Sequence, residues 1–223
     1  MNELVLDRVT LIVLTSVRID ENIEAMKRSM NGIKWGAVKF ISHEKPQGLP
    51  DGVVFEECNR LNSIDDFSRY TFLELHKHID TEFMILVHHD GWITRPSLWT
   101  DDFFKFDYIG APWPWHETAY KAPNGEHVVV GNGGMRLTSK RFLELPTKLG
   151  LDLEGELADD GKMYYGDDGN YCCIHRKIFL ENGIEYATAE KAALFSTEIW
   201  IDGLSRESFG FHGFRPHNIK YLN

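Results

Sequence analysis

Residues Phe83–Gly91 read FMILVHHDG and join five consecutive apolar residues to a short polar cluster of two histidines, an aspartate and a glycine. A continuous apolar run of this length is typical of a strand buried on both faces of a parallel sheet. Val9–Ser16 (VTLIVLTS) has the same character and also ends in small polar residues. Because ligands of such sheets bind beyond the carboxyl ends of the strands, residues 15–18 and 88–91 are expected to be neighbours.

Apolar residues spaced three and four apart predict helices between these strands. One helix is expected to follow an N-cap at Asp20, and a second covers Ile64–Ile79. Shorter strands are predicted at residues 37–42 and 53–56. This alternation is typical of an α/β fold with a mostly parallel central sheet flanked by helices.

The second part of the chain has a different composition, with aromatic, proline and glycine residues concentrated in Phe103–Tyr120. Helices are predicted at Lys140–Leu145 and Asn170–Asn182. No repeat, low-complexity tract or linker divides residues 1–223, so a single domain is expected.

The charge and the cysteines limit the possible partners and compartments. The formal net charge is −10 with the histidines neutral, which disfavours nucleic acid and anionic lipid as partners. The three cysteines include the adjacent pair Cys172–Cys173 and favour a reducing compartment over a disulfide framework. The first apolar run, Val9–Val13, is too short for a signal peptide or a membrane span. We therefore expect a soluble cytoplasmic protein.

Asp90 follows a buried strand directly and is the first candidate metal ligand. Transfer from a sugar nucleotide requires the diphosphate leaving group to be neutralised, and a divalent cation bridging both phosphates does this. A second ligand is needed, and His212 within Phe209–Gly213 (FGFHG) offers a neutral imidazole that suits Mn²⁺ or Zn²⁺. The alternatives are a simple turn at Asp90–Gly91 and a structural histidine in a glycine-rich turn.

Other polar or glycine-rich segments offer further candidates. Either Asp167 or Asp168 can act as a general base, although an acid at a helix start is also an ordinary N-cap. Gly131–Gly134 (GNGG) lets a ligand approach the backbone closely, but it lacks the spacing of a Walker loop or a dinucleotide fingerprint. Asp107–Trp115 is either a wall on which a sugar stacks or a packed loop.

Taken together, the order of these segments resembles a family of small bacterial and viral proteins of the GT-A glycosyltransferase type, known mostly as a domain of unknown function. The segments that carry the resemblance are, in order, His88–Gly91, DYIGAPW at Asp107–Trp113, GNGG at Gly131–Gly134, Asp167–Asp168 and FGFHG at Phe209–Gly213. The resemblance covers about residues 9–214. It implies a GT-A fold with a nucleotide-binding half over about residues 1–95 and an acceptor half over about residues 96–223.

GT-A enzymes carry an Asp-x-Asp motif after the fourth strand, and its last Asp binds Mn²⁺ or Mg²⁺. The resemblance gives this role to Asp90, and His212 looks like the C-terminal histidine that completes the metal shell. His88 stands where the family has the first Asp of the motif, which implies a contact with the ribose or a phosphate instead. The remaining residues that the resemblance assigns to donor binding are His89, Thr15, Ser16, Arg18, Arg69, Gly133 and Gly134. For Arg69 a surface arginine on an amphipathic helix is the alternative.

Asp168 matches the acid that serves as base in inverting relatives, and Asp167 would orient an acceptor hydroxyl. The expected activity is that of a hexosyltransferase, with a UDP-sugar as the favoured donor and a glycan as the acceptor. One alternative is a metal-dependent nucleotide-sugar phosphohydrolase, in which His88–Asp90 would supply a hydrolytic metal site. The other is a non-catalytic carbohydrate-binding module with a transferase-like fold, which the histidine at position 88 favours.

Overall fold

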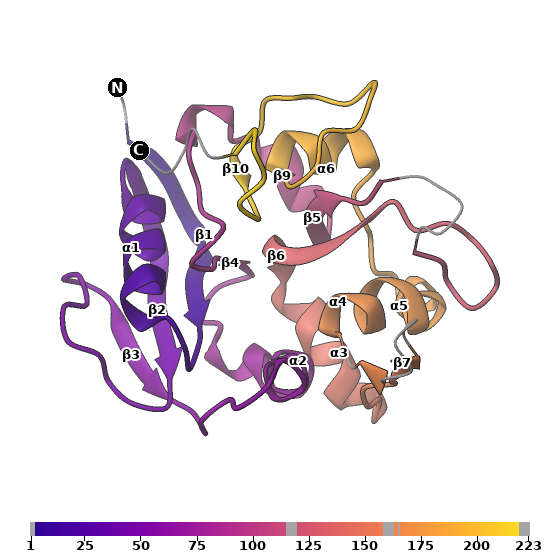
Figure 1. The fold of residues 1–223 in the computed structure, drawn as a ribbon, viewed down its shortest axis with the longest axis horizontal. Helices are drawn as coiled ribbons and strands as arrows, with labels where there is room; N and C mark the ends of the chain where they lie inside the picture. Colours follow the sequence, from indigo (N-terminus) through magenta and orange to yellow (C-terminus); the bar gives the residue numbers. More distant parts are fainter. Residues whose placement is uncertain (1–2, 115–119, 158–162, 165, 219–223) are drawn as a thin grey trace.

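The fold comes from a computed structural model that describes residues 3–114, 120–157, 163–164 and 166–218. A six-stranded sheet crosses it in the order β3-β2-β1-β4-β6-β5 (Figure 1). β1 to β4 are mutually parallel, whereas β6 runs antiparallel to both of its neighbours. The strands are β1 (Leu4–Leu14), β2 (Ile33–Ser42), β3 (Val54–Glu57), β4 (Phe83–Leu86), β5 (Tyr108–Pro112) and β6 (Val130–Ser139). The predicted α/β fold with a mostly parallel sheet is confirmed.

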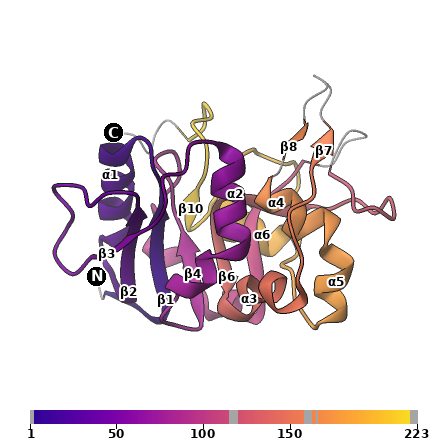
Figure 2. The same cartoon turned by 90° about the horizontal axis from the view of Figure 1, so that it is seen from below.

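Helices flank this sheet (Figures 1 and 2). Contacts join α1 to β1 and β2, α3 and α4 to β6, and α6 to β5. The α-helices are α1 (Ile19–Met30), α2 (Ile64–Leu73), α3 (Lys140–Leu149), α4 (Asp167–Gly169), α5 (Arg176–Glu181) and α6 (Ala189–Phe195). Shorter helical turns are η1 (Leu75–His78), η2 (Pro96–Leu98), η3 (Asp101–Lys105) and the π-helical η4 (Asn170–Ile174). Two small sheets pair β7 (Glu156–Leu157) with β8 (Met163–Tyr164), and β9 (Ser196–Thr197) with β10 (Gly210–Phe211).

The two apolar runs that predict the fold form the middle of the sheet. β1 lies between β2 and β4, and β4 lies between β1 and β6. Leu11 and Ile12 in β1 and Ile85 and Leu86 in β4 have no exposed surface. Both strands are therefore buried on both faces, as their uninterrupted apolar sequence predicts.

Several predicted helix boundaries differ from the structure. The N-cap before α1 is Arg18, and Asp20 lies in the first turn. Ser63 caps α2 because its side chain accepts from the amide of Asp66. The helix predicted over Asn170–Asn182 is wrong as a single element, since the chain forms π-helical η4 and then α5. Apolar spacing alone does not distinguish a π-helical turn from an α-helical one.

Within the described residues, no helix combines the length and the apolar character needed to cross a bilayer. The structure describes Cys58, Cys172 and Cys173, and none of the three takes part in a disulfide bond.

Candidate functional site

A pocket of about 370 Å³ opens at the carboxyl ends of β1 and β4. Residues that follow these two strands meet here, as the strand order predicts, and residues 61–64, at the start of α2, close the pocket. The lining residues are Leu14, Thr15, Ser16, Val17, Asn22, Leu61, Asn62, Ser63, Ile64, Phe67, His88 and His89. Four of the residues predicted to bind the donor therefore share one pocket.

Thr15 and Ser16 line this pocket, and their hydroxyl groups hold its loops in place. Thr15 Oγ1 donates to Val17 O (2.6 Å) and accepts from Val17 N (3.1 Å). Ser16 Oγ accepts from Leu61 N (2.9 Å), which ties the segment before α2 to the end of β1. The hydroxyls thus shape the pocket, and a direct contact with a ribose stays a prediction.

The two arginines predicted to bind the donor lie elsewhere. Arg18 has a left-handed backbone (φ 49°) and an exposed side chain, and it does not line the pocket. Arg69 on α2 binds Asp152 through two hydrogen bonds (2.6 and 3.1 Å) and borders a separate hollow. The structure therefore favours the surface alternative for Arg69, because a carboxylate of the chain already engages its guanidinium.

Asn22, in the first turn of α1, is a pocket residue that the sequence reading missed. Its side-chain nitrogen donates to Arg18 O (2.9 Å) and Val17 O (3.2 Å), which fixes the amide orientation. Its oxygen is buried and has no hydrogen-bond partner among the described residues. An unpartnered acceptor beside a pocket suits an N–H donor of a ligand. The residue type gave no signal, because asparagine near a helix start usually indicates a cap.

His88 and His89 form the wall of the pocket nearest to the candidate metal ligands. The His88 ring contacts Phe67 edge-on, with 5.4 Å between ring centroids. Burial, with the charge of nearby His212 acting in the same direction, lowers the pKa of His88 to about 3. His88 is therefore a neutral imidazole at physiological pH. His89 Nδ1 lies 3.8 Å from Asp90 Oδ1.

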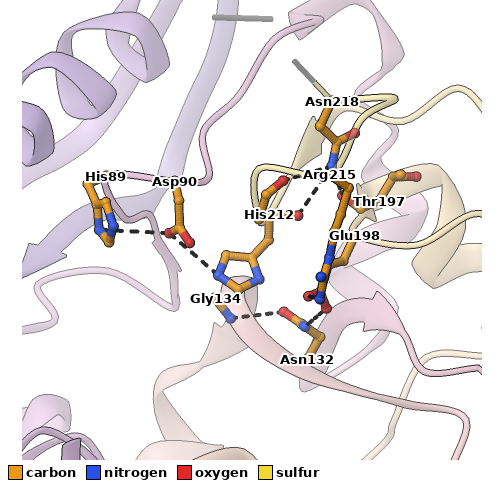
Figure 3. A network of polar contacts seen from close by, with 10 residues as sticks. His89, Asp90, Asn132, Gly134, Thr197, Glu198, His212, Arg215 and Asn218 are labelled. Atoms are coloured by element: carbon orange, nitrogen blue, oxygen red, sulfur yellow. Dashed lines mark hydrogen bonds and ion pairs between the residues drawn. The ribbon is translucent and has the colours of Figure 1, made fainter. Parts of the chain in front are cut away.

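Asp90 and His212, far apart in the chain, meet at this edge of the sheet. Asp90 Oδ1 lies 3.6 Å from His212 Nε2 (Figure 3). The amide of Gly213 donates to Asp90 O (2.8 Å), which joins the C-terminal segment to the end of β4. A Cβ at Gly134 on β6 would collide with the His212 imidazole. The glycine is thus required for the ring to lie where it does.

A hydrogen-bond network holds the segment that carries His212 (Figure 3). Asn132 on β6 accepts from Gly134 N (3.1 Å) and donates to Glu198, whose carboxylate also binds Arg215 (2.9 Å). The side chain of Asn218 donates to the carbonyl groups of His212 (3.3 Å) and Gly213 (3.1 Å). The sequence reading missed Glu198, because an isolated glutamate carries no motif and only the tertiary structure shows its partners.

Asp90 and His212 fit a divalent cation that binds together with a substrate. Within the described residues, no group of three or more His, Cys, Asp or Glu side chains is arranged to hold a metal ion. Ligands of Mg²⁺ lie about 2.1 Å from the ion in octahedral geometry, so neighbouring ligands are about 3 Å apart. The separation of 3.6 Å needs only a small adjustment. Mg²⁺ is commonly held by one or two side chains plus water and substrate phosphates.

Asp168, at the start of α4, lies on another side of the glycine pair. A Cβ at Gly133 would lie 3.3 Å from Asp168 Cβ. The N-cap of α4 is Gly166, so neither aspartate takes that position. Burial raises the pKa of Asp168 to about 7, and the neighbouring charge of Asp167 acts in the same direction. A carboxyl group that titrates near neutrality is well matched to proton transfer at physiological pH.

Asp167 points into the protein rather than towards solvent. It is 7% exposed, and Arg136 on β6 donates to its carboxylate at 2.6 Å. This ion pair disfavours the predicted contact with an acceptor hydroxyl, because the carboxylate is already engaged. Arg136 has no exposed surface, and the sequence reading missed it because arginine in a strand is ordinarily exposed.

The segment Asp107–Trp113 is packed inside the protein, so the packed alternative holds for these residues. Asp107 is 4% exposed and binds Arg141. Trp113 is 5% exposed and lies against Gly131, where a Cβ would collide with the indole ring. Trp115, the last residue of the segment Asp107–Trp115, lies outside the described residues.

Comparison with known proteins adds a family and a fold. A profile of the family described as "Protein of unknown function (DUF5672)" matches residues 53–212. The galactosyltransferase LgtC, solved with donor and acceptor sugar analogs, is similar in structure, with a TM-score of 0.51 and 12% identity over 93% of this chain and 87% of that chain. A solved active-site mutant of LgtC has a TM-score of 0.50 and 12% identity over 93% and 88% of the two chains. No curated protein matches the sequence.

A mannosyltransferase from Pyrobaculum calidifontis, solved with GDP-Man and Mn²⁺, has a TM-score of 0.46 and 14% identity. The match covers 81% of this chain, which spans about half (54%) of the length of that protein. Identities this low show the fold alone. The likeness to LgtC confirms the predicted GT-A fold class.

Proposed function

The chain belongs to the DUF5672 family of proteins of unknown function, and we propose that it is a glycosyltransferase that moves a sugar from a nucleotide diphosphate donor onto a glycan acceptor. The observation that carries the proposal is the convergence of Asp90 and His212 at the carboxyl edge of the sheet, beside the pocket behind Thr15 and His88. LgtC, which has the same fold, holds donor and acceptor sugar analogs and supports a transfer reaction. In this proposal residues 1–95 bind the nucleotide and residues 96–223 receive the acceptor.

The pocket behind β1 is the proposed site of the nucleoside, with a UDP-sugar as the donor. Phe67 and Ile64 offer apolar surface to a base, and Asn22 belongs to the same lining. None of the lining residues is an aspartate, glutamate, lysine or arginine. A neutral pocket suits a neutral base, while the diphosphate lies towards His88 and Asp90.

Asp90 and His212 would hold Mn²⁺ or Mg²⁺, and such a cation neutralises the charge that develops on the diphosphate as it leaves. His88 is neutral and can donate a hydrogen bond to a phosphate or ribose oxygen without adding charge. Side chains of Arg136, Asp168 and His212 fill the space that a Cβ at Gly133 or Gly134 would take, so these groups approach the β6 backbone closely. The donor sugar is proposed to lie beside this segment.

Asp168 is the proposed base of an inverting displacement. The acceptor hydroxyl oxygen forms a bond to the anomeric carbon while the bond from that carbon to the phosphate oxygen breaks. The leaving nucleoside diphosphate takes the electron pair, and the hydroxyl proton passes to the Asp168 carboxylate. An in-line displacement needs nucleophile and leaving group on opposite sides of the carbon. Asp168 lies next to Gly133 and His212 next to Gly134, so the proposed base and a proposed cation ligand both adjoin the glycine pair.

A nucleotide screen with a transfer assay tests the proposal. Thermal unfolding is followed with UDP, GDP, ADP or CDP, each with and without Mn²⁺. We expect UDP with Mn²⁺ to raise the Tm, by an amount that grows with ligand concentration over Kd. D90N and H212A should lose the part of the Tm increase that depends on Mn²⁺. D51N, at an exposed turn, should keep it.

Release of UDP from a UDP-sugar should then accelerate when a glycan acceptor is added. If no acceptor changes the rate at which the UDP-sugar is consumed, the result would instead favour a phosphohydrolase. Sugar binding that needs neither nucleotide nor metal would favour a non-catalytic module. If UDP with Mn²⁺ stabilises D90N, H212A and the unmodified protein equally, Asp90 and His212 do not hold the cation.

A further inference from the structure

A fully buried arginine lies beneath the glycine pair of the candidate site. Arg136 Nη1 lies 2.6 Å from Asp167 Oδ2. A Cβ at Gly133 would lie 2.6 Å from the same nitrogen and 3.3 Å from Asp168 Cβ. Arg136, Asp167 and Asp168 therefore form one cluster around Gly133.

The protein provides hydrogen-bond partners for only some of the N–H groups of the Arg136 guanidinium. Its Nε and Nη2 have no hydrogen-bond partner in the part of the chain that the structure describes. The ring of Tyr171 lies 5.6 Å from Arg136 Cζ and offers a π face. Burying an ion pair is often no more stabilising than apolar residues of similar volume, so stability alone does not explain this pair.

Four ionisable side chains of the described residues act on the Asp168 carboxyl or respond to it. They are Asp167 beside it, Arg136 on β6, Tyr108 on β5 and Cys172 on η4. Burial raises the pKa values of Tyr108 and Cys172 well above their usual range, so both stay neutral. Backbone amides of Gly169 and Gly133 also donate to the carboxyl. The charges that act on Asp168 are thus those of Asp167 and Arg136.

We propose that the buried Arg136–Asp167 pair is a positioning device that tunes the pH at which Asp168 becomes a base. Arg136 anchors Asp167 from inside the sheet, so that a fixed negative charge stands next to Asp168 in the chain. Burial is the main reason that Asp168 holds its proton until near-neutral pH. The negative charge of Asp167 raises the pKa of Asp168 further, and the positive charge of Arg136 acts against it. Since a base works best when its pKa is close to the working pH, the pair improves catalysis without touching a substrate. The inference rests on the proposed role of Asp168 as base.

The test is the titration of Asp168 itself, in the intact protein and without substrate. Protein labelled with ¹³C at the aspartate carboxyl carbons is titrated by NMR, and D168N identifies the resonance. In D167N the Asp168 midpoint is expected to fall by at least one pH unit. At a pH well below both midpoints, the ionised fraction of Asp168 then rises at least tenfold. In the transfer assay, kcat at pH 8 should fall because the base is weaker, while the donor KM stays within twofold.

Two control variants separate charge from structure. D167E keeps the charge and should keep the midpoint near that of the unmodified protein. D152N removes the aspartate of the exposed Arg69–Asp152 pair and should leave both midpoint and kinetics unchanged. Should D167N not fold, R136Q with D167N replaces the ion pair by two neutral amides, and the midpoint should move in the same direction by a smaller amount.

An unchanged Asp168 midpoint in D167N, or in the double variant if D167N does not fold, overturns the inference. A midpoint that moves as much in D167E as in D167N also overturns it, because the effect would then not come from charge. If the midpoint shifts as expected but the unmodified protein transfers no sugar, the proposed function fails and the relation between the three residues stands.

Discussion

At the scale of single residues, adding one methyl group at Gly134 should have a clear effect on Mn²⁺ binding. A methyl group there would collide with the His212 imidazole, and the ordinary backbone angles of Gly134 would otherwise accept alanine. We predict that G134A displaces His212 and weakens Mn²⁺ binding in the presence of UDP by about 10- to 100-fold, the size of effect seen when the support of a metal ligand is lost. Calorimetric titration measures this.

The control for G134A is a double variant. If both changes act through the same ligand, G134A with H212A should bind Mn²⁺ no more weakly than H212A alone. If the losses of Mn²⁺ affinity in the two single variants add up in the double variant, or if G134A binds Mn²⁺ with unchanged affinity, then Gly134 does not act by positioning His212.

Asp168 leads to a prediction about pH. Burial raises its pKa to about 7, and only the ionised carboxylate can accept a proton. We therefore predict that kcat falls about tenfold for each pH unit below about 7, and that D168N lowers kcat by about 10²- to 10⁴-fold. Steady-state rates between pH 5 and pH 9 test this. An acid limb near pH 4, the ordinary range of an aspartate, would contradict it.

The same group also affects stability, with the opposite dependence on pH. The pKa of Asp168 is raised above its unfolded value, so its contribution to stability is complete below about pH 4 and is lost as pH rises through about 7. D168N should consequently raise the Tm more at pH 8 than at pH 5. A stabilisation that is equal at both pH values would show that the carboxyl group is not perturbed by burial.

At the scale of elements, the carboxylate of Glu198 connects the C-terminal segment to β6. Glu198 joins Asn132 of β6 to Arg215, three residues beyond His212. We predict that E198Q lowers kcat and Mn²⁺ affinity about 10-fold through a less ordered His212. E207Q, which breaks the Glu207–Arg95 pair on an exposed carboxylate, is the matched control and should change neither quantity. If E198Q and E207Q change kcat and Mn²⁺ affinity equally, Glu198 does not act by positioning His212.

The elements also show where sequence patterns reach their limit. The two buried strands were predicted well because an unbroken apolar run has few other stable placements in a soluble protein. The region after Gly166 was predicted less well, since η4 and α5 bury Tyr171, Cys172 and Phe179 with a spacing that also fits one continuous helix. A π-helical turn closes i→i+5 hydrogen bonds, and the spacing of apolar residues alone does not distinguish it from an α-helical turn.

At the scale of the whole molecule, one edge of the sheet collects segments from the entire chain. We predict that UDP with Mn²⁺ slows amide hydrogen exchange in residues 14–17, 61–64, 87–91 and 209–213 together. Chelation with EDTA should remove the protection of 209–213, which reaches the ligand only through the cation, and keep that of 61–64. Residues of α5, which lies far from α1 and β1 in Figure 1, serve as the internal reference. Protection confined to residues 14–17 and 61–64 with Mn²⁺ present would contradict a shared cation.

The sequence by itself determined the α/β class and the two central strands, because an unbroken apolar run is a local property of the chain, and the order of its motifs supplied the candidates Asp90, His212 and Asp168. Only the tertiary structure decided which candidates meet. It brought Asp90 to His212 and turned Asp167 inward onto Arg136, and it engaged Arg69 with Asp152. It also disclosed Asn22 and Glu198 as residues of the site. The physical reason is that a charged side chain takes its role from its nearest opposite charge and from its burial, and both are set by residues distant in sequence.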